Sequence, residues 1–454
     1  MQIFIVMKPN NQFPKGIAYI IGNEAAERYS YYGMKAILVI FLTTMIYNNQ
    51  GQLAPLSEKE ATNWNHFFVF GVYGISILGA LLSDVYWGKY RTIIRLSIVY
   101  VIGHLFLALF ENYFGFFIGL TLIALGSGGI KPSVSAHLGD QFDEGNKHLL
   151  DRIFFWFYLA INAGAFFAYF SAERILKNPD LGSKVAFGLP GIFMLIATIV
   201  FYLGRKKYIA IKPAGWELYK KELFSEKGKS LLLKLLPVYA FIPVFWALYD
   251  QGGSTWVIQA NSPLMDKTVS FLGYSYSFFP SEIGYLNPLL IVILIPFFTL
   301  IFYPFIKKYI PFGYMQRIFI GMLLCAVSFM IIAWTQEKMD NGISVSIGWQ
   351  MLAYVIITIS EIFVSVSVLE FSYTQAPNAL KSIVSSISLF TVALGQIIVM
   401  VVNSSYNTEG ESINAGYFWI FVGLMIATAL LFYWVNRSYK EQEYLQVKEN
   451  IEAV

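Results

Sequence analysis

The chain has 454 residues, of which 57% are hydrophobic, 18% aromatic and only 13% charged. Because soluble proteins carry charge on about a quarter of their residues, this composition excludes a soluble globular protein and indicates that lipid covers most of the surface. The formal net charge is +4, and the single cysteine, Cys325, cannot form an intramolecular disulfide.

Twelve apolar runs follow one another along the chain. A helix needs about 20 mainly apolar residues to cross a bilayer. We therefore expect an all-α membrane protein with spans at residues 17–47, 64–86, 92–110, 113–136, 152–171, 186–204, 231–256, 286–306, 314–334, 346–373, 380–402 and 416–435. The aromatic and polar stretch 268–284 is predicted to be a loop beside the membrane.

Basic residues are concentrated in alternate connections. The segment 204–230 alone carries eight Lys and Arg residues, whereas the connections FENYFG and NSSYNTEGESINAG carry none. The positive-inside rule therefore predicts that both termini are cytoplasmic. The same segment separates six runs from six, so we expect an N-terminal six-helix bundle at 1–205, a basic cytoplasmic linker at 206–230 and a C-terminal six-helix bundle at 231–454.

Motifs for enzyme or ATP-driven chemistry are weak. The linker contains Gly228-Lys229-Ser230, but Leu223 stands where a phosphate-binding loop needs its first glycine. The four histidines are scattered, and no Cys/His cluster is present in the sequence. We therefore expect a non-enzymatic protein with no metal and no cofactor.

The first run begins with ionisable residues on one helical face. Glu24, Glu27 and Arg28 are spaced i, i+3 and i+4, and Tyr31 and Lys35 continue the same face. The cluster could anchor the helix end at the membrane interface. A polar stripe that lines a central cavity is the favoured reading, because charge in hydrocarbon is costly unless it is paired or faces water.

Other apolar runs also contain ionisable residues. Lys131 lies in the fourth run, Asp250 in the seventh and Glu361 in the tenth, while His66 opens the second run seven residues before Tyr73. Each is a candidate for transport chemistry by the same argument.

Several motifs resemble the proton-dependent oligopeptide transporter family of the major facilitator superfamily. The first run is similar to the family motif ExxERFxYYG, with Tyr29 in place of Phe. GALLSDVYWGKYRTIIRLSIVYVIG and FFWFYLAINAGAF resemble the signatures of the second and fifth helices, and GGIKPSVSAHLGDQF and LEFSYTQAPNALKS also fit. The resemblance implies the major facilitator fold with 12 transmembrane helices in two six-helix bundles.

The resemblance also implies roles in substrate binding. Arg28 and Lys131 would hold the carboxylate of a peptide, and Glu361 its α-amine. Tyr31, Tyr32, Tyr73, Asn162 and Asn287 would bind the peptide backbone, and Trp256 would form the wall of a side-chain pocket. For Trp256 and Asn287, plain helix packing stays open as an alternative. Ser388 stands where many members have a Trp, which predicts a roomier pocket.

Proton coupling follows from counting charges. A substrate carboxylate competes with Glu24 and Glu27 for Arg28 and Lys131, so an acid left without a cation should take up a proton. Glu24 and Glu27 are the leading proton carriers, followed by His66, with Glu361 also placed in the coupling. Pairs between Lys131 and Glu361 and between Lys35 and Asp250 are the expected cytoplasmic and outer gates.

The loop after the second run carries the remaining predicted gating residues. Asp84, Gly88 and Arg91 resemble a conformational motif of the superfamily.

The sequence thus predicts a symporter that uses the proton gradient to import di- and tripeptides across the bacterial inner membrane by alternating access. Peptides, protons and the lipid bilayer are the expected partners, nucleic acid is not, and the protein is expected to function as a monomer. A non-peptide zwitterion or a drug-like substrate is the alternative, and a channel or sensor is disfavoured because it would not need buried acids.

Overall fold

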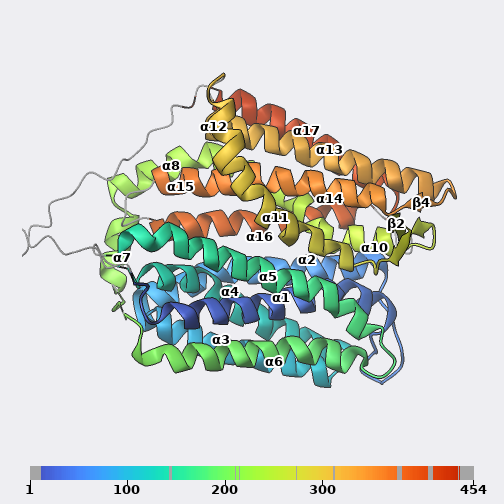
Figure 1. Ribbon diagram of the computed structural model, residues 1–454, viewed down its shortest axis with the longest axis horizontal. Coiled ribbons are helices and arrows are strands. Elements are labelled where there is room, and N and C mark those ends of the chain that lie inside the picture. Colours follow the sequence, from blue (N-terminus) through green and yellow to red (C-terminus); the bar gives the residue numbers. More distant parts are fainter. Residues whose placement is uncertain are drawn as a thin grey trace, which may run out of the picture.

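Each apolar run folds as a helix or as a chain of helical segments, because the bilayer offers no partner for an unpaired backbone amide or carbonyl. The computed structural model describes residues 12–142, 146–209, 211–213, 215–271, 273–309, 312–375, 381–406, 413–437 and 439. In Figure 1 the long helices lie side by side, with α1–α6 in one half of the molecule and α11–α17 in the other. We call the end that carries α7 and α8 the linker end, and the end that carries β2 and β4 the hairpin end.

Six long helices form the first half. Two of them begin with a side-chain cap: Ser57 and Glu60 make a capping box before α2, and the side chain of Asn112 accepts from Gly115 N at the start of α4. The elements are α1 (Ile17–Thr44), α2 (Glu58–Leu81), the π-helical turn η1 (Leu82–Trp87), α3 (Lys89–Leu109), α4 (Tyr113–Gly139), the 3-10 turn η2 (Lys147–Leu149), α5 (Leu150–Leu176), α6 (Gly182–Leu203) and the 3-10 turn η3 (Gly204–Lys206).

The second half is more interrupted than the first. The short helix α7 (Trp216–Leu223) precedes it along the chain, and α8 (Glu226–Tyr239) is its first element, since Leu235 and Val238 belong to its core. The elements that follow are α9 (Ile242–Tyr249), η4 (Asp250–Gly253), α10 (Thr255–Asn261), η5 (Glu282–Tyr285), α11 (Leu286–Phe297), η6 (Phe298–Phe302), α12 (Tyr303–Ile306), α13 (Tyr314–Asp340), α14 (Gly348–Glu361), η7 (Ile362–Val366), α15 (Ser367–Gln375), α16 (Lys381–Tyr406) and α17 (Ala415–Asn436).

Part of the predicted loop 268–284 forms β structure. β2 (Thr268–Phe271) pairs with β3 (Tyr274–Ser277) as an antiparallel hairpin. A second small sheet joins β1 (Met265–Asp266) to β4 (Val345–Ser346) in parallel. The expectation of a loop was therefore wrong for the residues of this hairpin, where Val, Phe and Tyr favour strands.

Ten helices within the described residues are long and apolar enough to cross a membrane, and a pair bent by 48° would make eleven. The bent pair is 228–239 with 242–261, which covers the seventh predicted span. α1 has 28 residues but is not among the ten; it carries Glu24, Glu27, Arg28 and Lys35. The fold is that of a multi-pass helical protein, and twelve spans remain a prediction that requires α1 to cross as well.

Each half has its own hydrophobic core. Phe41, Phe187 and Ile37 belong to the core of α1–α6, whereas Phe329 and Phe421 belong to the core of the second half. Val257 of α10 packs in the first of these cores, so the halves also share apolar contacts, and the predicted division at the linker stays a prediction.

Glycine allows α2 and α4 to approach closely. A Cβ on Gly79 would lie 2.4 Å from the Cα of Gly129, a distance that real side chains do not reach. Lys131 of the same helix also lies against α2, since its Nζ is 3.9 Å from the ring centroid of Tyr73.

Candidate functional site

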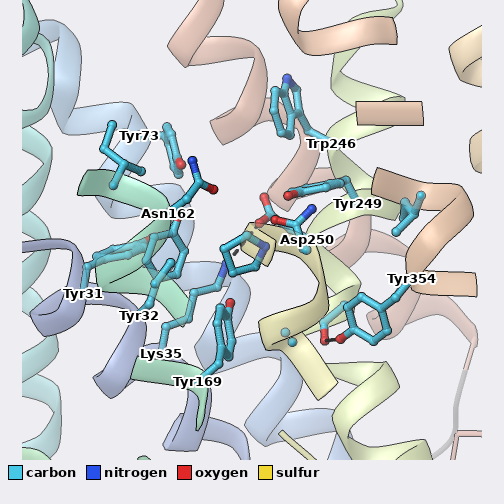
Figure 2. A pocket seen from close by; sticks show the side chains of 18 residues that line it. Tyr31, Tyr32, Lys35, Tyr73, Asn162, Tyr169, Trp246, Tyr249, Asp250 and Tyr354 are labelled. Atoms are coloured by element: carbon cyan, nitrogen blue, oxygen red, sulfur yellow. Dashed lines mark hydrogen bonds and ion pairs between the residues drawn. The ribbon is translucent and has the colours of Figure 1, made fainter. Parts of the chain in front are cut away.

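A cavity lies between the two halves of the molecule. Figure 2 shows that α1, α2 and α5 supply one side, and that α9, η4 and α14 are among the elements of the other. The lining is dominated by aromatic rings, with amides and one ion pair among them. The lining residues are Tyr31, Tyr32, Lys35, Tyr73, Ile161, Asn162, Ala165, Tyr169, Trp246, Tyr249, Asp250, Gly252, Gly253, Gly284, Asn287, Pro288, Tyr354 and Ile357.

The acidic and basic residues of α1 form a compact cluster. Arg28 Nε lies 2.9 Å from Glu24 Oε1 and 2.5 Å from Glu27 Oε2, so one guanidinium serves two carboxylates. All three side chains are buried, which excludes the alternative of a solvated anchor at the helix end. Gly164 of α5 packs directly on this turn, since a Cβ there would lie 2.4 Å from Ala25 O.

Lys131 is held by aromatic rings. Its Nζ lies 3.9 Å from the ring centroid of Tyr73 and 4.8 Å from that of Tyr31. Within the described residues this ammonium has no hydrogen-bond partner. Cation–π attraction partly replaces water around the charge, while its hydrogen-bonding capacity stays available to another molecule.

Glu361 lies on the opposite side, at the end of α14. Asn287 Nδ2 donates to Glu361 Oε2 at 2.7 Å, and Asn287 also contacts Thr358 Oγ1 at 3.2 Å. Among the ion pairs found in the described parts of the chain, none joins Glu361 to Lys131. A carboxylate and an ammonium therefore face the same interface from different halves without neutralising each other.

A chain of polar contacts crosses the interface beside the cavity. Lys35 Nζ donates to Asp250 Oδ1 at 3.0 Å, the contact drawn in Figure 2. Gln396 Nε2 donates to Asp250 Oδ2 at 2.6 Å. His66 contacts Gln396 Oε1 at 2.6 Å through Nδ1 and Ser254 Oγ at 2.9 Å through Nε2.

The predicted site residues fall into three groups. Seven of the predicted binding and gating residues line the cavity: Tyr31, Tyr32, Tyr73, Asn162, Asn287, Lys35 and Asp250. Arg28, Lys131 and Glu361 are not among the lining residues and contact it through neighbours: Arg28 and Lys131 through Tyr31, and Glu361 through Asn287. The remaining predicted residues lie elsewhere.

Trp256 and Ser388 do not line the cavity that the described residues enclose. Trp256 is fully buried, and its ring packs on Phe329 and Tyr354 in the core of the second half. This placement matches the packing alternative rather than a pocket wall. Ser388 is half-buried on α16.

The predicted conformational loop is remote from the cavity. Asp84 accepts from Ser83 Oγ at 3.0 Å, and Arg91 is exposed. Nearby, Lys89 Nζ donates to Asp140 Oδ2 at 2.6 Å and joins the start of α3 to the end of α4. Burial raises the pKa of the Asp140 carboxyl from its ordinary value, and the ion pair with Lys89 opposes that rise.

Sequence reasoning missed several residues of the site. Gln396 and Ser254 are polar residues within helical, largely apolar stretches, and that signal alone could have marked them. Trp246 and Tyr249 precede Asp250 by four residues and one residue on the same helical segment, and they line the cavity with it. Tyr169 and Tyr354 carry no sequence signal that separates them from ordinary packing aromatics.

No group of three or more His, Cys, Asp or Glu side chains in the described ranges is arranged to hold a metal ion. The charged groups of the site instead include a cluster within α1 and an ion pair between Lys35 and Asp250.

Comparison with known proteins identifies similar chains. The family whose model matches is the POT family, with residues 90–224 and 216–420 matched. Solute carrier family 15 member 2 of Rattus norvegicus is 33% identical over 408 residues, which are 79% of this chain and 54% of that protein. The chain therefore spans about half the length of the curated relatives it matches.

Solved structures match over nearly the full length. The crystal structure of an auto-inhibited POT family peptide transporter has a TM-score of 0.85 and 32% identity, and covers 96% of this chain and 99% of that chain. The POT family transporter PepTSo, solved in meso, has a TM-score of 0.83 and 34% identity, with 95% and 99% covered. The predicted family resemblance and helical fold are confirmed.

Proposed function

This chain belongs to the POT family, and we propose that it is a symporter that imports di- and tripeptides with protons by alternating access. Printed names of its relatives support the substrate class, since a Drosophila melanogaster protein named "Peptide transporter family 1" is 34% identical over 378 residues. We further propose that the chain spans the bacterial inner membrane as a monomer, with the linker end and both termini in the cytoplasm. The proton gradient would be the energy source, without a cofactor.

One observation carries this proposal. A cavity lined from both halves has an unpaired ammonium, Lys131, behind one wall and a carboxylate, Glu361, behind the other. A dipeptide is a zwitterion with its charges at opposite ends, and it could join the two halves through its own termini. Such a clamp would bind the two charged termini of the peptide and not its side chains, which suits a carrier of many different peptides.

The aromatic and amide lining would bind the rest of the peptide. Tyr32, Asn162 and Asn287 present hydroxyl and amide groups to the cavity. These groups can donate to peptide carbonyls and accept from peptide amides. Rings such as Tyr169 and Tyr249 offer apolar faces to side chains of differing size.

Coupling to protons would arise in the α1 cluster. Glu24 and Glu27 carry two negative charges against the single positive charge of Arg28, and all three are buried. A substrate carboxylate that approaches Arg28 and Lys131 adds a further negative charge. Uptake of a proton by Glu24 or Glu27 relieves that repulsion, so substrate and proton favour each other's binding.

Transport of a labelled dipeptide tests the proposal. Wild-type protein in liposomes is expected to accumulate radiolabelled dialanine when an inward proton gradient is imposed, and a protonophore should abolish the accumulation. Glu361→Gln keeps the size of the side chain but loses its charge, and should lose most of the uptake.

Glu370→Gln is the matched control for this experiment. Glu370 pairs with Arg317 within the second half and does not line the cavity, so gradient-driven uptake should persist. Equal uptake by wild type and Glu361→Gln would overturn the amine clamp. Uptake of another zwitterion, with dialanine ignored, would overturn the peptide assignment.

A further inference from the structure

Gln396 joins three segments from both halves of the molecule. Its side chain is fully buried on α16. Through it, Asp250 at the start of η4 is connected to His66 of α2, and His66 is in turn connected to Ser254. This amide is the central element of the chain of contacts that begins at Lys35.

The hydrogen bonds of Gln396 have only one consistent direction. Nε2 lies 2.6 Å from Asp250 Oδ2 and 3.2 Å from Val392 O, and both of those oxygens are acceptors. The NH₂ group must therefore face them, because the opposite amide orientation would bring three acceptor oxygens together. Oε1 is left to accept, and its partner is His66 Nδ1 at 2.6 Å.

This direction determines where His66 carries its hydrogen. Nδ1 must be the N–H that donates to Gln396 Oε1, whether the imidazole is neutral or charged. In the neutral ring, Nε2 accepts from the Ser254 hydroxyl; in the charged ring, Nε2 donates to Ser254 Oγ at the same 2.9 Å contact. A proton gained or lost by His66 therefore exchanges at Nε2, on the side away from Asp250.

We infer that Gln396 is a positioning residue of the hairpin-end gate: it holds the Asp250 carboxylate in place for Lys35 and insulates that carboxylate from the proton of His66. An amide oxygen is a very weak base, so the Nδ1 hydrogen cannot pass through Gln396 to Asp250. Lys35 donates to Asp250 Oδ1 and Gln396 donates to Asp250 Oδ2, so both carboxylate oxygens are held. This inference rests on the proposed function, because the gate is the gate of that transporter.

Few charged groups lie near the series of contacts that runs from Lys35 to Ser254. Asp250 on η4 is linked to His66 through Gln396, and Lys35 on α1 is paired with Asp250. The charged residues of α2 itself lie in its first turns, where Glu58 accepts from Ile413 N. α10, next to Ser254, has the sequence TWVIQAN and carries no charge.

Two substitutions of Gln396 separate its roles. Gln396→Met keeps the length of the side chain but removes both donors and the acceptor, so Asp250 and His66 each lose a partner. Gln396→Glu keeps the shape and needs a proton to donate to Asp250, because two carboxylates at 2.6 Å cannot both be ionised. Gln350→Met is the control, since Gln350 is equally buried and its Nε2 donates to Trp256 O and Gln259 Oε1 within the second half.

Distances across the hairpin end report on the gate without any substrate. Spin labels on L53C and I343C, in a background with Cys325→Ala, would sit on exposed loops of opposite halves. We expect Gln396→Met to shift the distance distribution to longer values, and Gln350→Met to leave it unchanged. Gln396→Glu should show the wild-type distance at pH 5 and the longer distance at pH 8.

Histidine NMR tests the tautomer directly. In ¹⁵N-histidine-labelled protein, with His66 assigned from its loss in His66→Gln, we expect the neutral ring to carry its hydrogen on Nδ1. In Gln396→Glu, the pH of half-maximal dialanine uptake should rise by about 1 unit or more, because the added carboxylate favours a proton nearby.

The outcomes distinguish this inference from the transport proposal. Unchanged distances in Gln396→Met, or a neutral His66 with its hydrogen on Nε2, would overturn the role of Gln396 even if wild-type protein transports dialanine. Failure of wild-type uptake with the predicted distance changes would instead overturn the peptide assignment and leave the gate intact.

Discussion

The interface between the two halves contains polar groups that are paired across it and charged groups that are not. Toward the hairpin end, side chains from opposite halves are joined by short polar contacts: Lys35 with Asp250, His66 with Gln396 and Ser254, Asn63 with Asn403, Arg174 with Glu282, Glu58 with Ile413 N and Glu173 with Ser281 N. Lys131 and Glu361, which also belong to opposite halves, are not paired with each other.

The contacts across the hairpin end indicate that this end of the interface is closed. Ion pairs and hydrogen bonds formed across the hairpin end stabilise contact there, and each must break before that end opens. Lys131 and Glu361 keep their charges available to a ligand with complementary charges. In an alternating-access carrier, the two ends should exchange these roles as the equilibrium between states shifts.

The largest expected effect comes from removing the guanidinium of the buried cluster on α1. Arg28→Ala leaves Glu24 and Glu27 buried without a guanidinium, and removing one partner of a buried ion pair costs about 3–5 kcal/mol. We expect gradient-driven dialanine uptake to be abolished and the melting temperature in detergent to fall. Arg28→Lys should keep stability better than uptake, because it keeps the charge without the fork.

Arg95→Ala is the control for this prediction. Arg95 is an exposed residue that contacts the Trp87 ring at 4.7 Å, and its removal should change neither readout much. Wild-type uptake by Arg28→Ala would show that the α1 cluster takes no part in transport.

The next effect concerns the ion pair between Lys35 and Asp250, which joins the halves toward the hairpin end. Lys35→Ala and Asp250→Ala each leave an unpaired charge at the buried 3.0 Å ion pair, and we expect about a tenfold loss of uptake or more. The charge-swapped double variant, Lys35→Asp with Asp250→Lys, should recover part of that loss. Losses that simply add in the double variant would mean that the two residues act independently.

A smaller effect concerns the aromatic ring that lies beside Lys131. Tyr73→Leu removes the ring that lies 3.9 Å from Lys131 Nζ, and a partly buried cation–π contact contributes about 1–2 kcal/mol. We expect the KM for dialanine to rise by roughly 5- to 30-fold with little change in folding. Tyr73→Phe retains the ring face and is the matched variant. Equal KM values for the Leu and Phe variants would exclude this role for the ring.

The smallest effect concerns a hydrogen bond between two uncharged side chains toward the hairpin end. Asn403 Nδ2 donates to Asn63 Oδ1 at 2.9 Å, and one neutral hydrogen bond contributes about 1 kcal/mol. Asn403→Ala should therefore move the distance between L53C and I343C labels only slightly, and uptake by less than about threefold. An effect as large as that of Asp250→Ala would show that the charged contacts at the hairpin end contribute no more than the neutral ones.

Much of the site could be predicted because charge inside an apolar run is a strong signal. Glu24, Glu27 and Arg28 stand out at helical spacing, and the structure brings them within ion-pair distance. Lys35 and Asp250 were paired in the prediction although 215 positions separate them, and they form the 3.0 Å contact. Whether these residues act in coupling and gating stays a prediction.

Other parts could not be read from the sequence. Trp256 is an aromatic in an apolar segment, and nothing in its neighbours says whether it faces a cavity or a core. Gln396 is an uncharged polar residue whose importance comes from two partners on other segments, at positions 66 and 250.

The sequence by itself determined the class of protein, the positions of most helices and the charged residues within them. It could do so because the hydrocarbon of a bilayer imposes one requirement on every span, and each span meets it locally. Only the tertiary structure decided that Lys131 and Glu361 stay unpaired with each other and that the amide of Gln396 connects Asp250 to His66. These arrangements depend on side chains from separate helices meeting across an interface, and no local pattern in the chain encodes that meeting.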